Sequence, residues 1–160
     1  MFDRVTGIPA HPLFIHAAVV LVPLLALVAV LYGVWPASRR HIRWPLVAFA
    51  IAAPISVFFA KESGESFSTN RAFQSPQLKA AITEHEGYAD KLFWVILGLA
   101  VVALVMAFMI PASREGTERI KAPAVAHYVV AGLSVILAAA AAFYVYKTGD
   151  SGAHMAWEGF

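Results

Sequence analysis

The stretch PLFIHAAVVLVPLLALVAVLYGVW (Pro12–Trp35) contains no Asp, Glu, Lys or Arg. A helix needs roughly 20 apolar residues to cross ~30 Å of hydrocarbon, so this stretch is long enough to span a bilayer. Further apolar segments follow at about residues 44–62, 76–111 and 122–147. The spacing predicts a single transmembrane domain over residues 1–160, with an extramembrane extension at the start of its third span.

The composition of the whole chain favours the same class of protein. The chain is 60% hydrophobic and only 14% charged, with a mean hydropathy of +0.70, whereas soluble domains are roughly a quarter charged. We therefore predict an all-α integral membrane protein, an antiparallel four-helix bundle surrounded by the lipid bilayer.

Several kinds of function are excluded by residues that the sequence lacks. The chain has no Cys, which excludes disulfides, thiolate metal sites and covalent c-type haem attachment. Its basic residues flank the apolar segments and form no stripe interleaved with aromatic residues, so nucleic acid is not an expected partner. No hydrolase, P-loop or zinc-protease motif is present, and the chain is not expected to be an enzyme on its own.

Two short sequence motifs each occur twice along the chain. PASRRHIR (Pro36–Arg43) and PASREGTERIKAP (Pro111–Pro123) share their opening letters, and AKESGES (Ala60–Ser66) resembles YKTGDSG (Tyr146–Gly152). Spans one–two and three–four are therefore predicted to be repeated helical hairpins that point the same way. The alternative explanation is that these short motifs are simply common in loops and do not reflect a repeat.

The second pair of motifs, Ala60–Ser66 and Tyr146–Gly152, also predicts where two helices end. Glycine is suited to the left-handed conformation that stops a helix. We expect such stops at Gly64 and Gly149, after which the chain folds back over the bundle. Matching residues would then surround one mouth of the bundle: Glu65 and Ser66 in the first hairpin, Asp150 and Ser151 in the second.

The distribution of Lys and Arg predicts the orientation, because cytoplasmic loops are enriched in these residues. The short loops concentrate their basic residues within a few positions, namely Arg39, Arg40, Arg43, Arg114, Arg119 and Lys121. The opposite side spreads an equal number over longer segments, namely Arg4, Lys61, Arg71, Lys79, Lys91 and Lys147. Both termini are therefore expected outside.

The third span is predicted to begin well before its apolar part. Ser75 followed by Pro76 is typical of a helix start. Apolar residues then recur at helical spacing from Leu78 to Leu92, and His85 lies on the same stripe. We expect His85 to face the other helices, where it could serve a site or simply cap the bundle at headgroup level.

Polar residues gather at the predicted outer end of the bundle. His16 is one turn inside an apolar helix, where a polar group needs a partner. His11 and His16 are about 140° apart around a helix, so both cannot bind one metal from a regular helix. Imidazole can bind iron, copper or zinc, relay protons or hydrogen-bond a quinone. The candidate cofactor ligands are His11, His16, His85 and His154, of which the last three are candidate metal ligands; candidate supporting residues are Lys61, Glu62, Glu65, Gly149, Asp150, Ser151 and Trp157.

Three stretches together resemble a known family. HPLFIHAAVVLVPL, HEGYADKL and TGDSGAHMAW are similar to the bacterial membrane family known as domain of unknown function 2231, and the similarity extends over essentially the whole chain. The resemblance implies four spans in the bacterial cytoplasmic (inner) membrane. Because some members are joined to Rieske or cytochrome-type modules, it also implies a respiratory or haem-linked role.

The resemblance carries over to a limited set of positions. Two departures from the family pattern are visible: Ala17-Ala18 replaces a common Phe-Pro, and Asp150 stands where His is common, which removes one candidate haem ligand. The positions that the resemblance implies are functional are His11, His16, His85, Gly149, Ser151 and Trp157.

Two hypotheses about function follow. In the first, haem b or a transition metal ion is bound between His16, His85 and His154 for respiratory electron transfer. In the second, the chain is a non-enzymatic accessory or structural subunit, partnered by respiratory or other membrane subunits or by a second copy. A small carrier is a third reading, and at four spans it would require a dimer.

Overall fold

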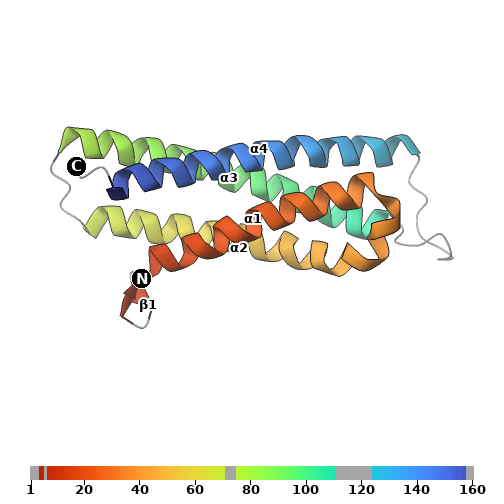
Figure 1. The fold of residues 1–160 in the computed structure, drawn as a ribbon, viewed down its shortest axis with the longest axis horizontal. Coiled ribbons are helices and arrows are strands. Elements are labelled where there is room, and N and C mark those ends of the chain that lie inside the picture. The colour runs from red at the N-terminus through yellow and green to blue at the C-terminus, as the bar shows by residue number, and fades with distance from the viewer. Residues whose placement is uncertain (1–3, 6, 71–74, 111–123, 158–160) are drawn as a thin grey trace.

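Four long helices form an antiparallel bundle (Figure 1). The computed structural model describes residues 4–5, 7–70, 75–110 and 124–157. The long helices are α1 (Ala10–Val34), α2 (Arg39–Asn70), α3 (Pro76–Met109) and α4 (Ala124–Trp157). The first and last described residues lie at the same end of the bundle (Figure 1). The predicted all-α four-helix bundle is therefore confirmed.

The helices pack in a ring in which each contacts its two neighbours. Helix α1 packs against α2 and α4, and α3 packs against the same two helices. Helices α1 and α3 contact each other only sparsely, so they are diagonal partners across the bundle. Side chains on α1 and α3 that point inward at the same level therefore face each other.

Short elements precede and connect the helices. A small antiparallel hairpin, β1 (Arg4–Val5) and β2 (Ile8–Pro9), leads into α1, and the 3-10 turn η1 (Pro36–Ser38) joins α1 to α2. Gly7, between the two strands, has a φ of +87°, a conformation that other residues rarely adopt. The second connection, which holds the repeated word Pro111–Pro123, lies outside the described residues.

The core is built mainly from small and branched apolar side chains. Val22, Leu25, Ile96, Leu99 and Met106 are fully buried, together with alanines from all four helices. Small residues also allow close approach of α1 to α4: a Cβ added to Gly33 would lie 3.3 Å from both Ala131 Cβ and Ser134 Oγ. Close backbone contact of this kind is how helices associate in lipid, where apolar burial alone provides little driving force.

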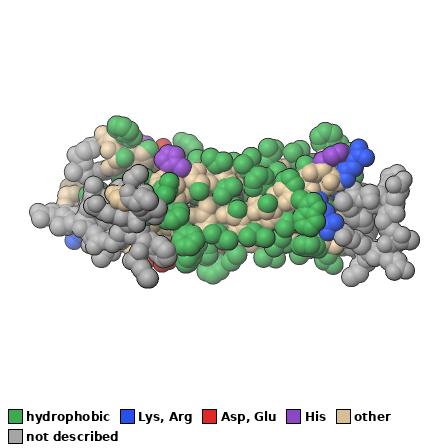
Figure 2. All heavy atoms as spheres, turned by 90° about the horizontal axis from the view of Figure 1, so that it is seen from below, with side chains coloured by type: hydrophobic (Ala, Val, Ile, Leu, Met, Phe, Trp, Pro, Cys, Tyr) green, Lys and Arg blue, Asp and Glu red, His purple; other side chains and the backbone are tan. Residues whose placement is uncertain are grey.

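The outside of the bundle is as apolar as the inside. Figure 2 shows an apolar middle with Lys, Arg and His side chains gathered towards the two ends. Large hydrophobic side chains are exposed on every long helix, for example Val20, Ile51, Val101 and Ile136. All four helices are long and apolar enough to cross a membrane. An exterior of this kind suits lipid, not water.

Two predicted helix ends were wrong, and one predicted start is confirmed. Helix α2 continues through Gly64 to Asn70, and α4 continues through Gly149 to Trp157, so the chain does not fold back at either glycine. Gly7 is the one glycine with positive φ in the described part of the chain. Ser75 does cap α3: its side chain accepts a hydrogen bond from the Leu78 N–H, with Pro76 next to it.

Candidate functional site

His11 is tied to the neighbouring helix at the end of the bundle that carries both termini. It belongs to the first turn of α1, where Pro12 is tolerated. Its Nδ1 donates to the Ala60 carbonyl on α2 at 2.9 Å and lies 3.3 Å from Ser63 Oγ. Since a carbonyl only accepts, Nδ1 carries the proton. In the neutral ring the lone pair is then on Nε2.

His85 makes the matching contact on the other side of the bundle. Its Nδ1 lies 2.9 Å from Ser151 Oγ on α4. The Ser151 hydroxyl donates to the Thr148 carbonyl at 3.1 Å, so it accepts the proton of His85 Nδ1. The Ser63 hydroxyl likewise donates to its own helix, with the Phe59 carbonyl at 2.7 Å and the Ala60 carbonyl at 3.0 Å. Both rings are therefore held in the same tautomer.

The two histidines form a pair across the bundle. They come from the diagonal helices α1 and α3, and their rings are near enough to interact electrostatically. Each is anchored to a serine on the helix that completes its own hairpin. We call this group of residues, His11, Ser63, His85 and Ser151, the histidine site, and this end of the bundle the histidine end.

The contacts support the internal repeat but correct its register. His11 corresponds to His85, Ala60 to Thr148 and Ser63 to Ser151. The expected alignment had matched Gly64 with Gly149. The contacts instead match it with Gly152, because a Cβ at Gly64 would lie 2.9 Å from His11 Cε1 and one at Gly152 would lie 3.3 Å from His85 Cε1.

An ion-paired group follows Ala60, the residue that accepts from His11, along α2. Lys61 links α2 to α3, with its Nζ 2.6 Å from Glu65 and 3.4 Å from Asp90. This ion-paired group lies near the bundle rim, because Glu65 and Asp90 are exposed. Of the predicted supporting residues, Lys61 thus contacts α3 through Asp90, whereas Glu65 pairs with Lys61 within α2.

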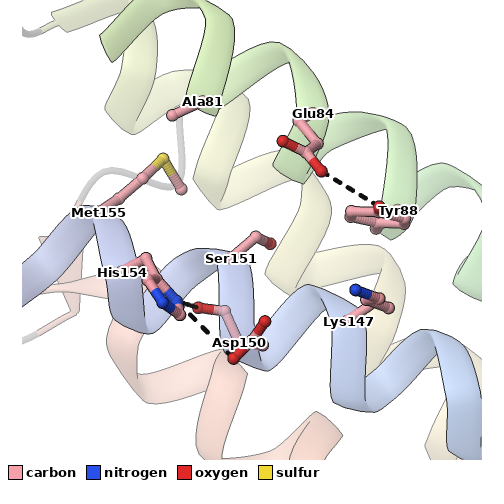
Figure 3. A pocket seen from close by; sticks show the side chains of 8 residues that line it. All are labelled: Ala81, Glu84, Tyr88, Lys147, Asp150, Ser151, His154 and Met155. Carbon is pink, nitrogen blue, oxygen red and sulfur yellow. Dashed lines mark hydrogen bonds and ion pairs between the residues drawn. The ribbon is translucent and has the colours of Figure 1, made fainter. Parts of the chain in front are cut away.

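An open cleft of about 300 Å³ lies between α3 and α4 at the same end. Figure 3 shows Glu84 and Tyr88 on one wall, and Asp150, Ser151 and His154 on the other. The Tyr88 hydroxyl donates to Glu84 at 3.1 Å. Because Ser151 also accepts from His85, it connects the cleft to the histidine site.

Other predicted site residues lie away from the pair. His16 faces outward from α1 and hydrogen-bonds the Pro12 carbonyl of its own helix, so it does not meet His85. His154 is also exposed, with its Nδ1 donating to the Asp150 carbonyl at 2.8 Å. Trp157 is 87% exposed at the end of α4. The helix phase that turns His11 inward turns His16 outward, because about 140° separates them.

Two more of the expected supporting residues are Glu62 and Gly149. Glu62 is half-buried on α2, and Gly149 is exposed with no atom near its missing Cβ. No group of three or more His, Asp or Glu in the described ranges could hold a metal ion. A bare-ion site built from His16, His85 and His154 therefore lacks the required proximity.

Sequence reasoning missed Ser63 and Gly152. The signal for both was present, because the dipeptide Ser-Gly occurs at Ser63-Gly64 and again at Ser151-Gly152. A helical Ser-Gly provides a hydroxyl beside a gap in the helix surface, and an imidazole fits that gap. The fully buried Ser63, 1% exposed, is the better hidden of the two.

The opposite end of the bundle, here named the arginine end, is organised by Arg39. Its Nε donates to the Tyr32 carbonyl at 2.8 Å, and its Nη2 donates to Gly33 O at 3.1 Å and His127 Nε2 at 3.0 Å. These carbonyls belong to the last turn of α1, where a cation satisfies unpaired acceptors and the helix dipole. Arg39 thus ties α1, α2 and α4 together.

Comparison with known proteins places the chain in a family. No curated protein and no solved structure matches it significantly. Residues 7–159 match the family described as predicted membrane protein (DUF2231). The four apolar helices of the bundle agree with that description. The chain therefore belongs to the DUF2231 family of membrane proteins.

Proposed function

We propose that the histidine site binds haem b between His11 and His85, and that the protein serves electron transfer in a respiratory membrane. The observation that carries this proposal is the shared tautomer of the two rings. Each Nδ1 donates to an acceptor on a neighbouring helix, which leaves Nε2 as the nitrogen with the lone pair. This is the arrangement usual for histidines that bind a metal, whose second N–H is held by a carbonyl or similar group.

The number of nearby donors favours haem over a bare ion. Haem iron takes its equatorial ligands from the porphyrin and needs protein only at its axial positions, which histidine commonly fills. A pair of imidazoles from diagonal helices meets that need, and bundle cores are built to hold cofactors from facing helices. A zinc or copper ion would need more ligands than the described residues bring together. The absence of Cys restricts the haem to a non-covalent type.

The same contacts also suit an accessory subunit that binds no cofactor. Hydrogen bonds from histidine and serine across neighbouring helices stabilise membrane bundles by themselves. The Ala60 and Ser63 contacts of His11 would then serve only packing. The two functions differ in one measurable property, the presence of iron.

The experiment uses protein purified from its native membrane. We would record oxidised and dithionite-reduced absorption spectra and the iron content of the wild type, H11A, H85A and H16A. We expect a haem spectrum that is lost in H11A and H85A. H16A is the matched control, because His16 is exposed and hydrogen-bonds the Pro12 carbonyl of its own helix, and it should keep the spectrum.

A second variant guards against simple loss of the fold. H85M offers haem iron a thioether ligand in place of imidazole and should shift the spectrum without abolishing it. Wild-type protein without stoichiometric haem or metal would overturn the proposal and leave the accessory-subunit function. Loss of the spectrum in H16A alone would equally overturn the assignment of His11 and His85.

A further inference from the structure

Arg43 lies at the perimeter of the arginine end, between two aromatic rings. Its guanidinium carbon is 5.5 Å from the centre of the Trp44 ring and 5.7 Å from that of Phe108, which belongs to α3. Both rings are largely exposed, at 67% for Trp44 and 54% for Phe108. The cation therefore bridges α2 and α3 on the surface that faces lipid.

The charge of Arg43 has no acidic partner within the described parts of the chain. The ion pairs of Lys or Arg described there belong to Lys61, at the opposite end of the bundle. Arg43 Nε is also buried without a hydrogen-bond acceptor among the described residues. Arg39, one turn earlier, differs because its donors are used by backbone carbonyls and His127. A buried donor left unpaired is unfavourable. Arg43 as a whole is only half-buried, so an anion outside the chain can approach its guanidinium, and a rotation of the side chain would bring Nε to that acceptor.

We propose that Arg43 binds the phosphate of an anionic phospholipid, with the exposed Arg40 adding to the attraction. Guanidinium presents donors in a planar fork that matches phosphate oxygens. Basic groups between transmembrane helices recognise anionic headgroups through this chemistry. The inference is independent of any cofactor at the histidine site.

The surroundings of Arg43 fit a lipid, not a free phosphate ion. The exposed aromatic residues Trp35, Trp44 and Tyr128 form a belt at this end, which is where Trp and Tyr meet lipid headgroups. From this belt towards the middle of the bundle, α2 and α3 expose Ile51, Ile55 and Val101. These side chains offer an apolar surface for the acyl chains of the same lipid.

The test measures lipid binding by native mass spectrometry and thermal melting in detergent. Wild type, R43Q and K79Q would be titrated with phosphatidylglycerol, phosphatidylcholine and inorganic phosphate. We expect phosphatidylglycerol to bind and stabilise the wild type, and R43Q to bind it about tenfold more weakly. K79Q is the matched control, because it removes one charge from an exposed position at the histidine end, and it should behave as the wild type.

Three outcomes would overturn the proposal. Equal binding of both lipids would show that the site has no preference for a negatively charged headgroup. Wild-type affinity in R43Q would show that Arg43 does not contribute to lipid binding. Stabilisation by inorganic phosphate equal to that by phosphatidylglycerol would indicate a site for a free anion. If R43Q does not fold, R43K is the second variant, because it keeps the charge but lacks the planar guanidinium. R43K should bind phosphatidylglycerol more weakly than the wild type. Unchanged binding in R43K would contradict the proposed guanidinium contact.

Discussion

Among the glycines that the structure describes, Gly64 has the tightest surroundings. A side chain there would meet the His11 ring, which cannot easily withdraw because its Nδ1 is bonded to Ala60 O. Gly149 also stands between a hydroxyl residue and an acidic residue, but no atom lies within 4 Å of the position that its Cβ would occupy. The two glycines therefore have different roles although their flanking sequences are similar.

Substitution of these glycines tests the corrected register of the repeat. We expect G64A to lower the free energy of unfolding by ~1–3 kcal/mol, because it overpacks the contact with His11. G149A should be neutral or stabilising by up to ~1 kcal/mol, since Ala favours helix over Gly. Thermal or denaturant unfolding in detergent measures both. Similar losses in the two variants would contradict the register given by the histidine contacts.

At the scale of single elements, α3 is longer than a membrane requires. Its 34 residues extend ~51 Å, whereas the hydrocarbon core is ~30 Å thick. The surplus lies largely at the histidine end, where Pro76–Lys91 precedes the apolar part and positions His85. The start of this extension is fixed by the Ser75 cap, so the cap supports the geometry of the site indirectly.

Removal of the cap should therefore loosen the extension. We expect S75A to cost ~1 kcal/mol of stability, because the Leu78 N–H loses its acceptor. T83A is the control: the exposed Thr83 hydroxyl bonds only to the Lys79 carbonyl of its own helix, and its removal should change stability by less than ~0.5 kcal/mol. Hydrogen exchange of the first turns of α3 would locate the change. Unaltered exchange in S75A would show that packing alone holds this helix start.

For the whole molecule, the bundle sets two chemically distinct ends apart. The histidine end carries the first and last described residues, the histidine site and the cleft, whereas the arginine end carries Arg39 and Arg43. The apolar middle of the helices separates these ends by the thickness of a membrane. Because basic residues crowd the short connection at the arginine end, we expect this end to face the cytoplasm.

Labelling with an impermeant maleimide tests this orientation. The chain has no Cys, so each single substitution introduces a unique thiol. We expect A153C to react in intact cells and A37C to react only after the membrane is opened; both native residues are exposed. The reverse pattern would invert the orientation. Reaction of both in intact cells would contradict a bundle whose ends lie on opposite sides of the membrane.

The sequence by itself determined the class of protein, the four helical segments and the start of α3. Apolar length and the absence of charge decide a span regardless of its neighbours, and the Ser75-Pro76 cap depends only on local backbone chemistry. His11, His85 and Ser151 were also among the candidate residues, because polar groups next to apolar runs stand out.

Only the tertiary structure decided which of these groups meet. The rotation of a soluble helix can be read from its apolar stripe, but here the lipid-facing side is as apolar as the core, so the pattern does not reveal the inward face. His16 was therefore expected inside, although α1 turns it to the surface and turns His11 inward. The pairing of His11 with Ser63 and of His85 with Ser151 depends on contacts between helices that no local spacing encodes.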